Sequence, residues 1–262
     1  MSQTPAQRLA DAIRGVRRER VAMVAFMTAG FPSKESFRAD LESLASEADV
    51  VEIGVPFTDP MADGVTIQRS SLAALAQGVS LGWIIDTLKA MPRVKAQLVF
   101  MGYFNPMLAY GLTRLAADAA AAGVAGFIVP DLPMEESGEF EKALAAHGLA
   151  MIRMVTPVTA PQRLEQLCRS AQGFVYAVSM TGTTGRSVGG TGGVPKETLD
   201  YFDRVRKLSP VPVCAGFGIR DHAQVAALAA HVDGVVVGSA VIEAMEKGES
   251  PAALLRGLRG EK

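Results

Sequence analysis

Short apolar runs alternate with helix-like segments along the whole chain, and this alternation constrains the fold more than any other feature of the sequence. Nearly every pair of neighbouring runs is separated by one segment of helical periodicity. The runs are continuously apolar, which is typical of parallel strands buried on both faces. The eight strand candidates are Val21–Met27, Val50–Ile53, Gln97–Met101, Ala125–Val129, Ala150–Val155, Phe174–Val178, Val211–Cys214 and Gly234–Val237. The clearest helical segments between them are Leu112–Ala122, Glu135–His147, Gln162–Cys168, Lys196–Leu208 and His222–Ala230.

The number of repeats predicts an α/β fold of the (β/α)₈ barrel type, with a doubly wound open sheet as the alternative. The chain has 262 residues, close to the roughly 250 of a typical barrel of this kind. No linker, charge block or change of composition divides it, so we expect one domain over residues 1–262.

Two helix starts are visible near the N-terminus. Thr4-Pro5-Ala6-Gln7 has the pattern of an N-cap, a proline at the first helical position and an N3 glutamine, which predicts an extra helix before the first strand. Ser33 is the predicted cap of a later helix that carries Phe37, Leu41 and Leu44 on one face.

Composition excludes several function classes. The 26 basic and 27 acidic residues give a net charge of −1, so no global charge favours binding to nucleic acid or an anionic membrane. The longest uncharged stretch, Ala96 to Thr113, contains proline and glycine and does not resemble a membrane-spanning helix. Cys168 and Cys214 lie in apolar surroundings, and we expect reduced thiols in a cytoplasmic protein.

Glycine pairs follow the last two predicted strands. Gly216-Phe217-Gly218 and Gly238-Ser239 each precede a helical segment, where free backbone N–H groups and the helix dipole favour an anion. Either pair alone could simply turn the chain. Together, after strands 7 and 8 of a barrel, they predict a phosphate site.

Two carboxylates follow the second strand. Glu52 ends an apolar strand, where burial raises the pKa of a carboxyl group and suits it to proton transfer. Asp63 lies eleven residues further on, in a loop that also contains Asp59. Asp-Pro and Asp-Gly are common turn sequences, so spacing does not decide whether Asp63 or Asp59 is catalytic or only turns the chain.

Other strand ends suggest how a substrate is enclosed. The glycine-rich segment 181–193 after strand 6 is either a flexible connector or a lid that excludes water. Aromatic residues lie near several strand ends, where they either line an apolar slot for a flat ring or fill the barrel. These aromatic residues are Phe26, Tyr103, Tyr176 and Phe217.

Several cofactor signatures are missing from the sequence. The three histidines fall on helical segments and no cluster has metal-ligand spacing, so we expect no metal. No lysine ends an apolar strand, which argues against a Schiff-base aldolase, and no GxGxxG follows the first strand. The sequence therefore predicts acid–base chemistry without a cofactor on a phosphorylated small molecule.

The chain resembles the tryptophan synthase α subunit family in several blocks that follow the family's order from the first strand to the last. The longest is Glu52-Ile-Gly-Val-Pro-Phe-Thr-Asp-Pro-Met-Ala-Asp-Gly64, with Thr66-Ile67-Gln68 after it. The other blocks are Val129-Pro-Asp-Leu-Pro133, Thr183-Thr184-Gly185, Gly216-Phe-Gly-Ile219 and Val237-Gly-Ser-Ala240.

The resemblance implies cleavage of indole-3-glycerol phosphate to indole and glyceraldehyde 3-phosphate, with Glu52 and Asp63 as the catalytic acids. It implies that Thr184 and Gly185 belong to a lid. By the same resemblance, the phosphate contacts are Gly185, Gly218, Gly238 and Ser239, and the indole contacts are Phe26, Tyr103, Tyr176 and Phe217. The lid departs from the commonest family pattern by Thr183 in place of valine.

The resemblance also implies a partner, a pyridoxal-phosphate-dependent β subunit that receives indole in an α2β2 heterotetramer. No cofactor is expected on this chain itself. The implied docking residues are Asp59, Pro60, Asn105 and Asp131. Three alternatives remain: a lyase that works without a β subunit, a non-catalytic activating subunit, and a different phosphate-binding barrel enzyme.

Overall fold

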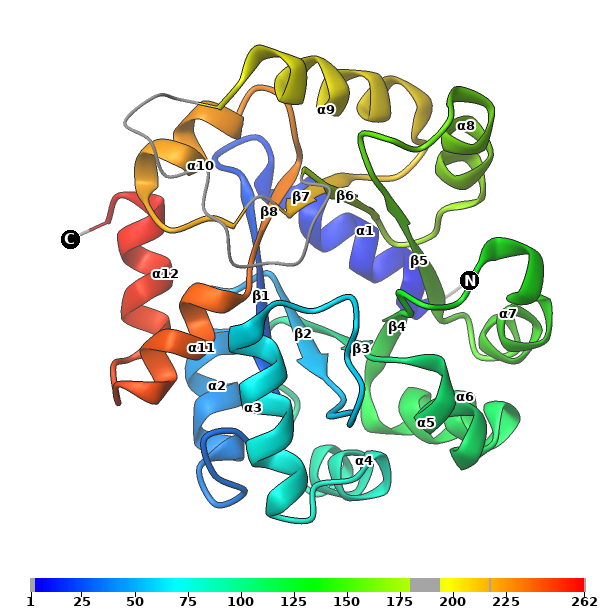
Figure 1. The fold of residues 1–262 in the computed structure, drawn as a ribbon, viewed down its shortest axis with the longest axis vertical. Coiled ribbons are helices and arrows are strands. Elements are labelled where there is room, and N and C mark those ends of the chain that lie inside the picture. Colours follow the sequence, from blue (N-terminus) through cyan, green and yellow to red (C-terminus); the bar gives the residue numbers. More distant parts are fainter. Residues whose placement is uncertain (1–2, 180–193, 217, 262) are drawn as a thin grey trace.

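The computed structural model describes residues 3–179, 194–216 and 218–261, and its strands form a closed parallel barrel. Each strand pairs with the next, and β8 closes the ring against β1 (Figure 1). This confirms the barrel and excludes the open sheet. The expected single domain over residues 1–262 stays a prediction. The strands are β1 (Ala22–Thr28), β2 (Val50–Gly54), β3 (Gln97–Met101), β4 (Val124–Ile128), β5 (Ala150–Val155), β6 (Val175–Val178), β7 (Val213–Gly216) and β8 (Gly234–Val237).

Helices surround the barrel and cover the outer face of its strands (Figure 1). Within the described residues they are α1 (Pro5–Val16), α2 (Phe37–Glu47), α3 (Val65–Ala76), α4 (Leu81–Lys89), α5 (Phe104–Tyr110), α6 (Leu112–Ala122), α7 (Gly138–Ala145), α8 (Pro161–Ser170), α9 (Lys196–Leu208), α10 (His222–Leu228), α11 (Ser239–Glu246) and α12 (Pro251–Arg259). A short 3₁₀ helix, Met134–Glu136, precedes α7. No described helix is long and apolar enough to cross a membrane alone, and the bent pair α3 and α4 meets the length and composition criteria only when combined.

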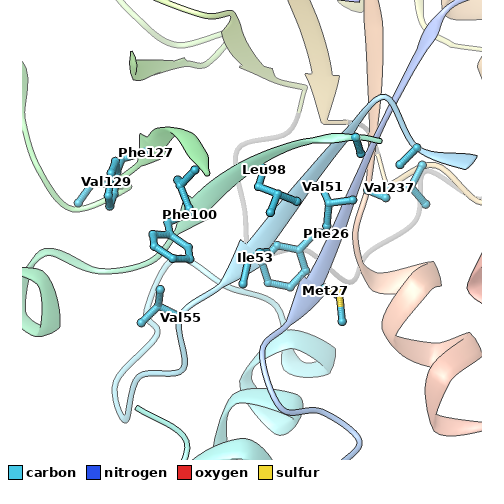
Figure 2. Packing of buried hydrophobic residues seen from close by; sticks show 14 of the residues in the cluster. Phe26, Met27, Val51, Ile53, Val55, Leu98, Phe100, Phe127, Val129 and Val237 are labelled. Carbon is cyan, nitrogen blue, oxygen red and sulfur yellow. The ribbon is translucent and has the colours of Figure 1, made fainter. Parts of the chain in front are cut away.

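The predicted extra helix α1 closes the N-terminal end of the barrel. Its capping box forms as expected: Gln7 N donates to Thr4 Oγ1 at 3.2 Å, and Thr4 N donates to Gln7 Oε1 at 2.8 Å. Leu9 and Ile13 are fully buried against interior residues of the strands, such as Val24. A second, larger core lies between the strands and the outer helices; Figure 2 shows part of it. The functional end is therefore the opposite, C-terminal end of the strands.

The expected starts of two helices, α2 and α7, are wrong. Ser33 does not cap α2; its hydroxyl accepts a hydrogen bond from Ser36 N at 3.1 Å within a turn, and the helix begins at Phe37. The expected helix Glu135–His147 is divided, since a 3₁₀ turn ends at Glu136 and α7 begins at Gly138. In both places serine side chains stabilise a turn before the helix, which the apolar periodicity does not reveal.

Candidate active site

Glu52 points into the C-terminal half of the barrel from β2. Its Cα pairs with Phe26 on β1 and with Val99 on β3. The side chain is fully buried, and neither carboxylate oxygen has a hydrogen-bond partner within the described part of the chain. Burial raises the pKa of Glu52 to about 8. The group therefore carries a proton at neutral pH and has a free O–H to direct at a bound molecule.

Asp63 lies in the loop between β2 and α3, facing Tyr103 at the end of β3. The Tyr103 hydroxyl donates a hydrogen bond to Asp63 Oδ2 at 3.1 Å and accepts one from Ala62 N at 2.8 Å. Burial raises the pKa of Asp63 to about 6, and the hydrogen bond from Tyr103 opposes that rise. Asp63 is thus a carboxylate that gains and loses its proton near neutral pH.

Side chains of α3 hold this loop in place. Gln68 Nε2 donates to the carbonyl of Asp63 at 2.9 Å. The hydroxyl of Ser71 accepts from Phe57 N at 2.8 Å, and the Phe57 ring stacks on Tyr103 with centroids 5.2 Å apart. The sequence singled out Gln68 only as part of a motif and missed Ser71, although both lie in the helix that directly follows the acidic loop.

A pocket lies beside Asp63, near the ends of the first three strands, and Glu52 is not among the residues that line it. Phe26, Gly54, Asp63 and Tyr103 contribute to its lining. The Phe26 ring covers Gly54, where an added Cβ would lie 2.4 Å from the ring, so no larger residue fits there. Figure 2 shows the Phe26 side chain on β1. The residues that line this pocket are mostly apolar.

Tyr176 faces the same interior from β6. Burial raises the pKa of its hydroxyl well above the usual value, and the nearby charges of Glu52 and Asp63 raise it further. The structure thus brings Tyr176, from the opposite wall of the barrel, close enough to interact electrostatically with both carboxylates.

The predicted phosphate residues lie after β7 and β8. Gly218 has a φ of +66°, which favours glycine, and no atom of the described residues would lie within 4 Å of an added Cβ. Gly238 is the N-cap of α11 and Ser239 is its first residue. The backbone N–H groups at the start of α11 therefore lie next to the end of the β7 strand, since β7 and β8 are paired.

Comparison with known proteins supplies the family. The family model described as "Tryptophan synthase alpha chain" matches residues 14–258. The chain belongs to the tryptophan synthase alpha chain family. A tryptophan synthase alpha chain from Solidesulfovibrio magneticus is 46% identical over 243 residues, covering 92% of this chain and 93% of that protein. One from Geobacter sulfurreducens is 46% identical over 230 residues, covering 87% and 86%.

Solved structures of the tryptophan synthase family have the same fold. A chain of Mycobacterium tuberculosis tryptophan synthase superimposes with a TM-score of 0.87 at 34% identity, covering 99% of this chain and 98% of that one. The alpha chain from Legionella pneumophila gives a TM-score of 0.84 at 29% identity, covering 97% and 96%. The family, the barrel fold and the carbon–carbon lyase class expected from the sequence are therefore confirmed.

The structure also locates the residues that the family resemblance assigned to docking. Asp59, Asn105 and Asp131 are exposed, whereas Pro60 is buried. Asp131 Oδ1 accepts from Phe104 N at 2.9 Å at the start of α5. All four residues follow β2, β3 or β4, so they share the end of the barrel that holds the acids. Three other assigned residues, Thr184, Gly185 and Phe217, lie outside the described residues.

Proposed function

We propose that this chain cleaves indole-3-glycerol phosphate to indole and glyceraldehyde 3-phosphate, with Glu52 and Asp63 as its acid–base pair. One observation carries the proposal: Glu52 is a fully buried carboxyl group whose two oxygens have no partner among the described residues. An unpaired buried polar group costs free energy. Its retention is best explained by a substrate atom that completes its interactions.

Glu52 supplies the proton that allows the carbon–carbon bond to break. The bond to an indole ring carbon breaks only after that carbon, C3, is protonated and the ring becomes an electron sink. A carboxyl group with a pKa of about 8 holds this proton at neutral pH. After delivering it, the carboxylate of Glu52 takes the proton of the glyceryl hydroxyl as the bond breaks, and the acid is restored.

Asp63 acts at the ring nitrogen, where positive charge develops in the same step. With a pKa of about 6, its side chain is largely ionised at neutral pH and stabilises or accepts the N–H proton. Tyr103 donates a hydrogen bond to Oδ2 of Asp63, and Oδ1 is the oxygen that we assign to the substrate.

The remaining contacts orient the two halves of the substrate. The indole ring binds among Phe26, Tyr103, Tyr176 and Phe217. The phosphate binds to backbone groups at Gly185, Gly218, Gly238 and Ser239, and Thr184 belongs to the lid that excludes water. None of these steps requires a cofactor.

A β subunit is the proposed partner, with pyridoxal phosphate on that subunit and an α2β2 assembly in the cytoplasm. Two large apolar side chains at the C-terminal end of the barrel support docking there: Met61 is 78% exposed and Leu108 is 52% exposed. They flank the proposed docking residues Asp59 and Asn105 in the chain. The structures of Mycobacterium tuberculosis tryptophan synthase make such a partner the natural expectation.

The test is indole release from indole-3-glycerol phosphate by the purified chain, alone and with a cognate β subunit. We expect slow release alone, a large increase with the partner, and loss of at least about 10²-fold in Glu52→Gln and Asp63→Asn. Glu139→Gln, an exposed residue of α7, is the matched control and should retain activity. Fast release that ignores the partner would indicate a stand-alone lyase. No release by a folded wild-type chain would contradict the proposal.

A further inference from the structure

A charged cluster outside the pocket joins three elements around Glu243 of α11. Arg220, in the segment between β7 and α10, donates from Nη1 to Glu243 Oε2 at 2.7 Å and from Nη2 to Oε1 at 2.9 Å. Thr66, in the first turn of α3, donates to Glu243 Oε1 at 3.4 Å. The Glu243 carboxylate therefore contacts Arg220, which lies 23 residues earlier in the chain, and Thr66, which lies 177 residues earlier.

Each of these three elements carries a part of the proposed site. Arg220 follows Gly218 by two residues. Glu243 lies just over one turn into the helix that begins at Ser239. Thr66 follows Asp63 by three residues. The cluster consequently links both proposed phosphate segments to the helix behind the acidic loop.

The charges of the cluster are balanced. The hydrogen bond from Arg220 is the main cause that lowers the pKa of Glu243, and Thr66 lowers it further. Glu243 is therefore ionised at neutral pH. A lone negative charge in this helix would oppose a phosphate at its N-terminus, whereas the bidentate pair with Arg220 compensates it.

From these contacts we propose that Glu243 is a positioning residue that holds the phosphate end and the Asp63 end of the site in one relative arrangement. The inference rests on the proposed function, since it assigns Glu243 a task in the same site. Cleavage requires the ring and the phosphate to be held at a fixed separation, and a displacement of about 1 Å can cost up to about 10²-fold in rate.

The chain contains a matched control for this bridge. Arg69 and Glu246 also join α3 to α11 by a bidentate pair, with both contacts at 2.7 Å. The exposure of the two pairs is similar: 54% and 28% for Arg69 and Glu246, against 43% and 29% for Arg220 and Glu243. Glu246 lies farther from the start of α11 and contacts neither Arg220 nor Thr66 in the described structure. Glu246→Gln thus removes a link between the same helices and spares the bridge.

The experiment compares Glu243→Gln, Arg220→Met and Glu246→Gln in the full chain, with and without the β subunit. We would measure kcat and KM for indole release, the affinity for inorganic phosphate, and the thermal unfolding midpoint. Arg220→Met should raise KM and weaken phosphate binding with little change in kcat, because only the phosphate end loses its support. Glu243→Gln should also raise KM and weaken phosphate binding, and in addition it should lower kcat by roughly tenfold. Glu246→Gln should match the wild type in each kinetic value.

Several outcomes would overturn the inference. Equal kinetics in Glu243→Gln and Glu246→Gln would show that Glu243 only stabilises helix packing. Recovery of wild-type KM in the double variant Arg220→Met/Glu243→Gln would show that the pair acts through charge alone. If the wild type released no indole, the proposed function would be contradicted. The positioning role of Glu243 would then be judged from the phosphate affinities of the variants alone.

Discussion

Glu52 makes the stability of the protein depend on pH in a direction unusual for a carboxyl group. Its pKa rises from the ordinary value of 4.5 to about 8 on folding, so the folded chain holds the proton more tightly. The stabilising effect of that proton is complete below about pH 4.5 and is lost as the pH rises to about 8.

Glu52→Gln replaces the group with a neutral side chain of similar shape. We expect this variant to be more stable than the wild type by a few kcal/mol at pH 8, and equal to it near pH 4. Urea unfolding at both pH values measures the difference, with the exposed Glu139→Gln as control. A gain of the same size at both pH values would contradict the assigned pKa.

Tyr103 adjusts the proton affinity of Asp63 through one hydrogen bond. Because this bond lowers the pKa of Asp63, Tyr103→Phe should raise that pKa above about 6. The acidic limb of the pH profile of kcat should therefore move to higher pH, by roughly one unit. Steady-state indole release between pH 5 and 9 measures it. An unchanged profile would show that Asp63 is not the group titrating there.

At the scale of elements, α1 stabilises the barrel from the end opposite to the acids. Leu9 is fully buried, and its Cδ2 atom would lie 2.7 Å from a Cβ added at Gly173. We expect Leu9→Ala to lower the free energy of unfolding by about 2–5 kcal/mol, with KM and kcat unchanged at a temperature where the variant is folded. Chemical denaturation and indole release test this, with the exposed Arg8→Ala as control. A raised KM would mean that α1 also shapes the site.

Elements were predictable from the sequence where apolar runs coincide with backbone pairing. The bounds of β3, β5 and β8 match the expected ones. By contrast, β7 was expected over Val211–Cys214 and is observed over Val213–Gly216. Pro212 has no N–H to donate, and although its carbonyl accepts a hydrogen bond from Val175 N at 2.8 Å, the paired register begins at Val213. An apolar run indicates burial, but it does not by itself show which residues form the backbone hydrogen bonds between strands.

At the scale of the whole molecule, the candidate site was also only partly predictable from the sequence. The burial of Glu52 was predictable because this residue lies at the end of an apolar strand, whereas its catalytic role stays a prediction. Asp63 was left open by its turn sequence, and the resemblance assigned it. Its partner Tyr103 is 40 residues away, and the Arg220–Glu243 pair joins segments that no local pattern connects. Contacts of this kind depend on barrel closure, which places the ends of distant strands side by side.

Barrel closure also determines how another protein can attach. Every strand within residues 3–179, 194–216 and 218–261 has a neighbour on both sides, so the barrel formed by these residues offers no free strand edge along which a second chain could extend the sheet. A partner that binds this barrel therefore contacts its side chains and loops. Such a contact surface can change residue by residue without disturbing the backbone ladder that supports Glu52, so recognition and catalysis can evolve at different rates in one fold.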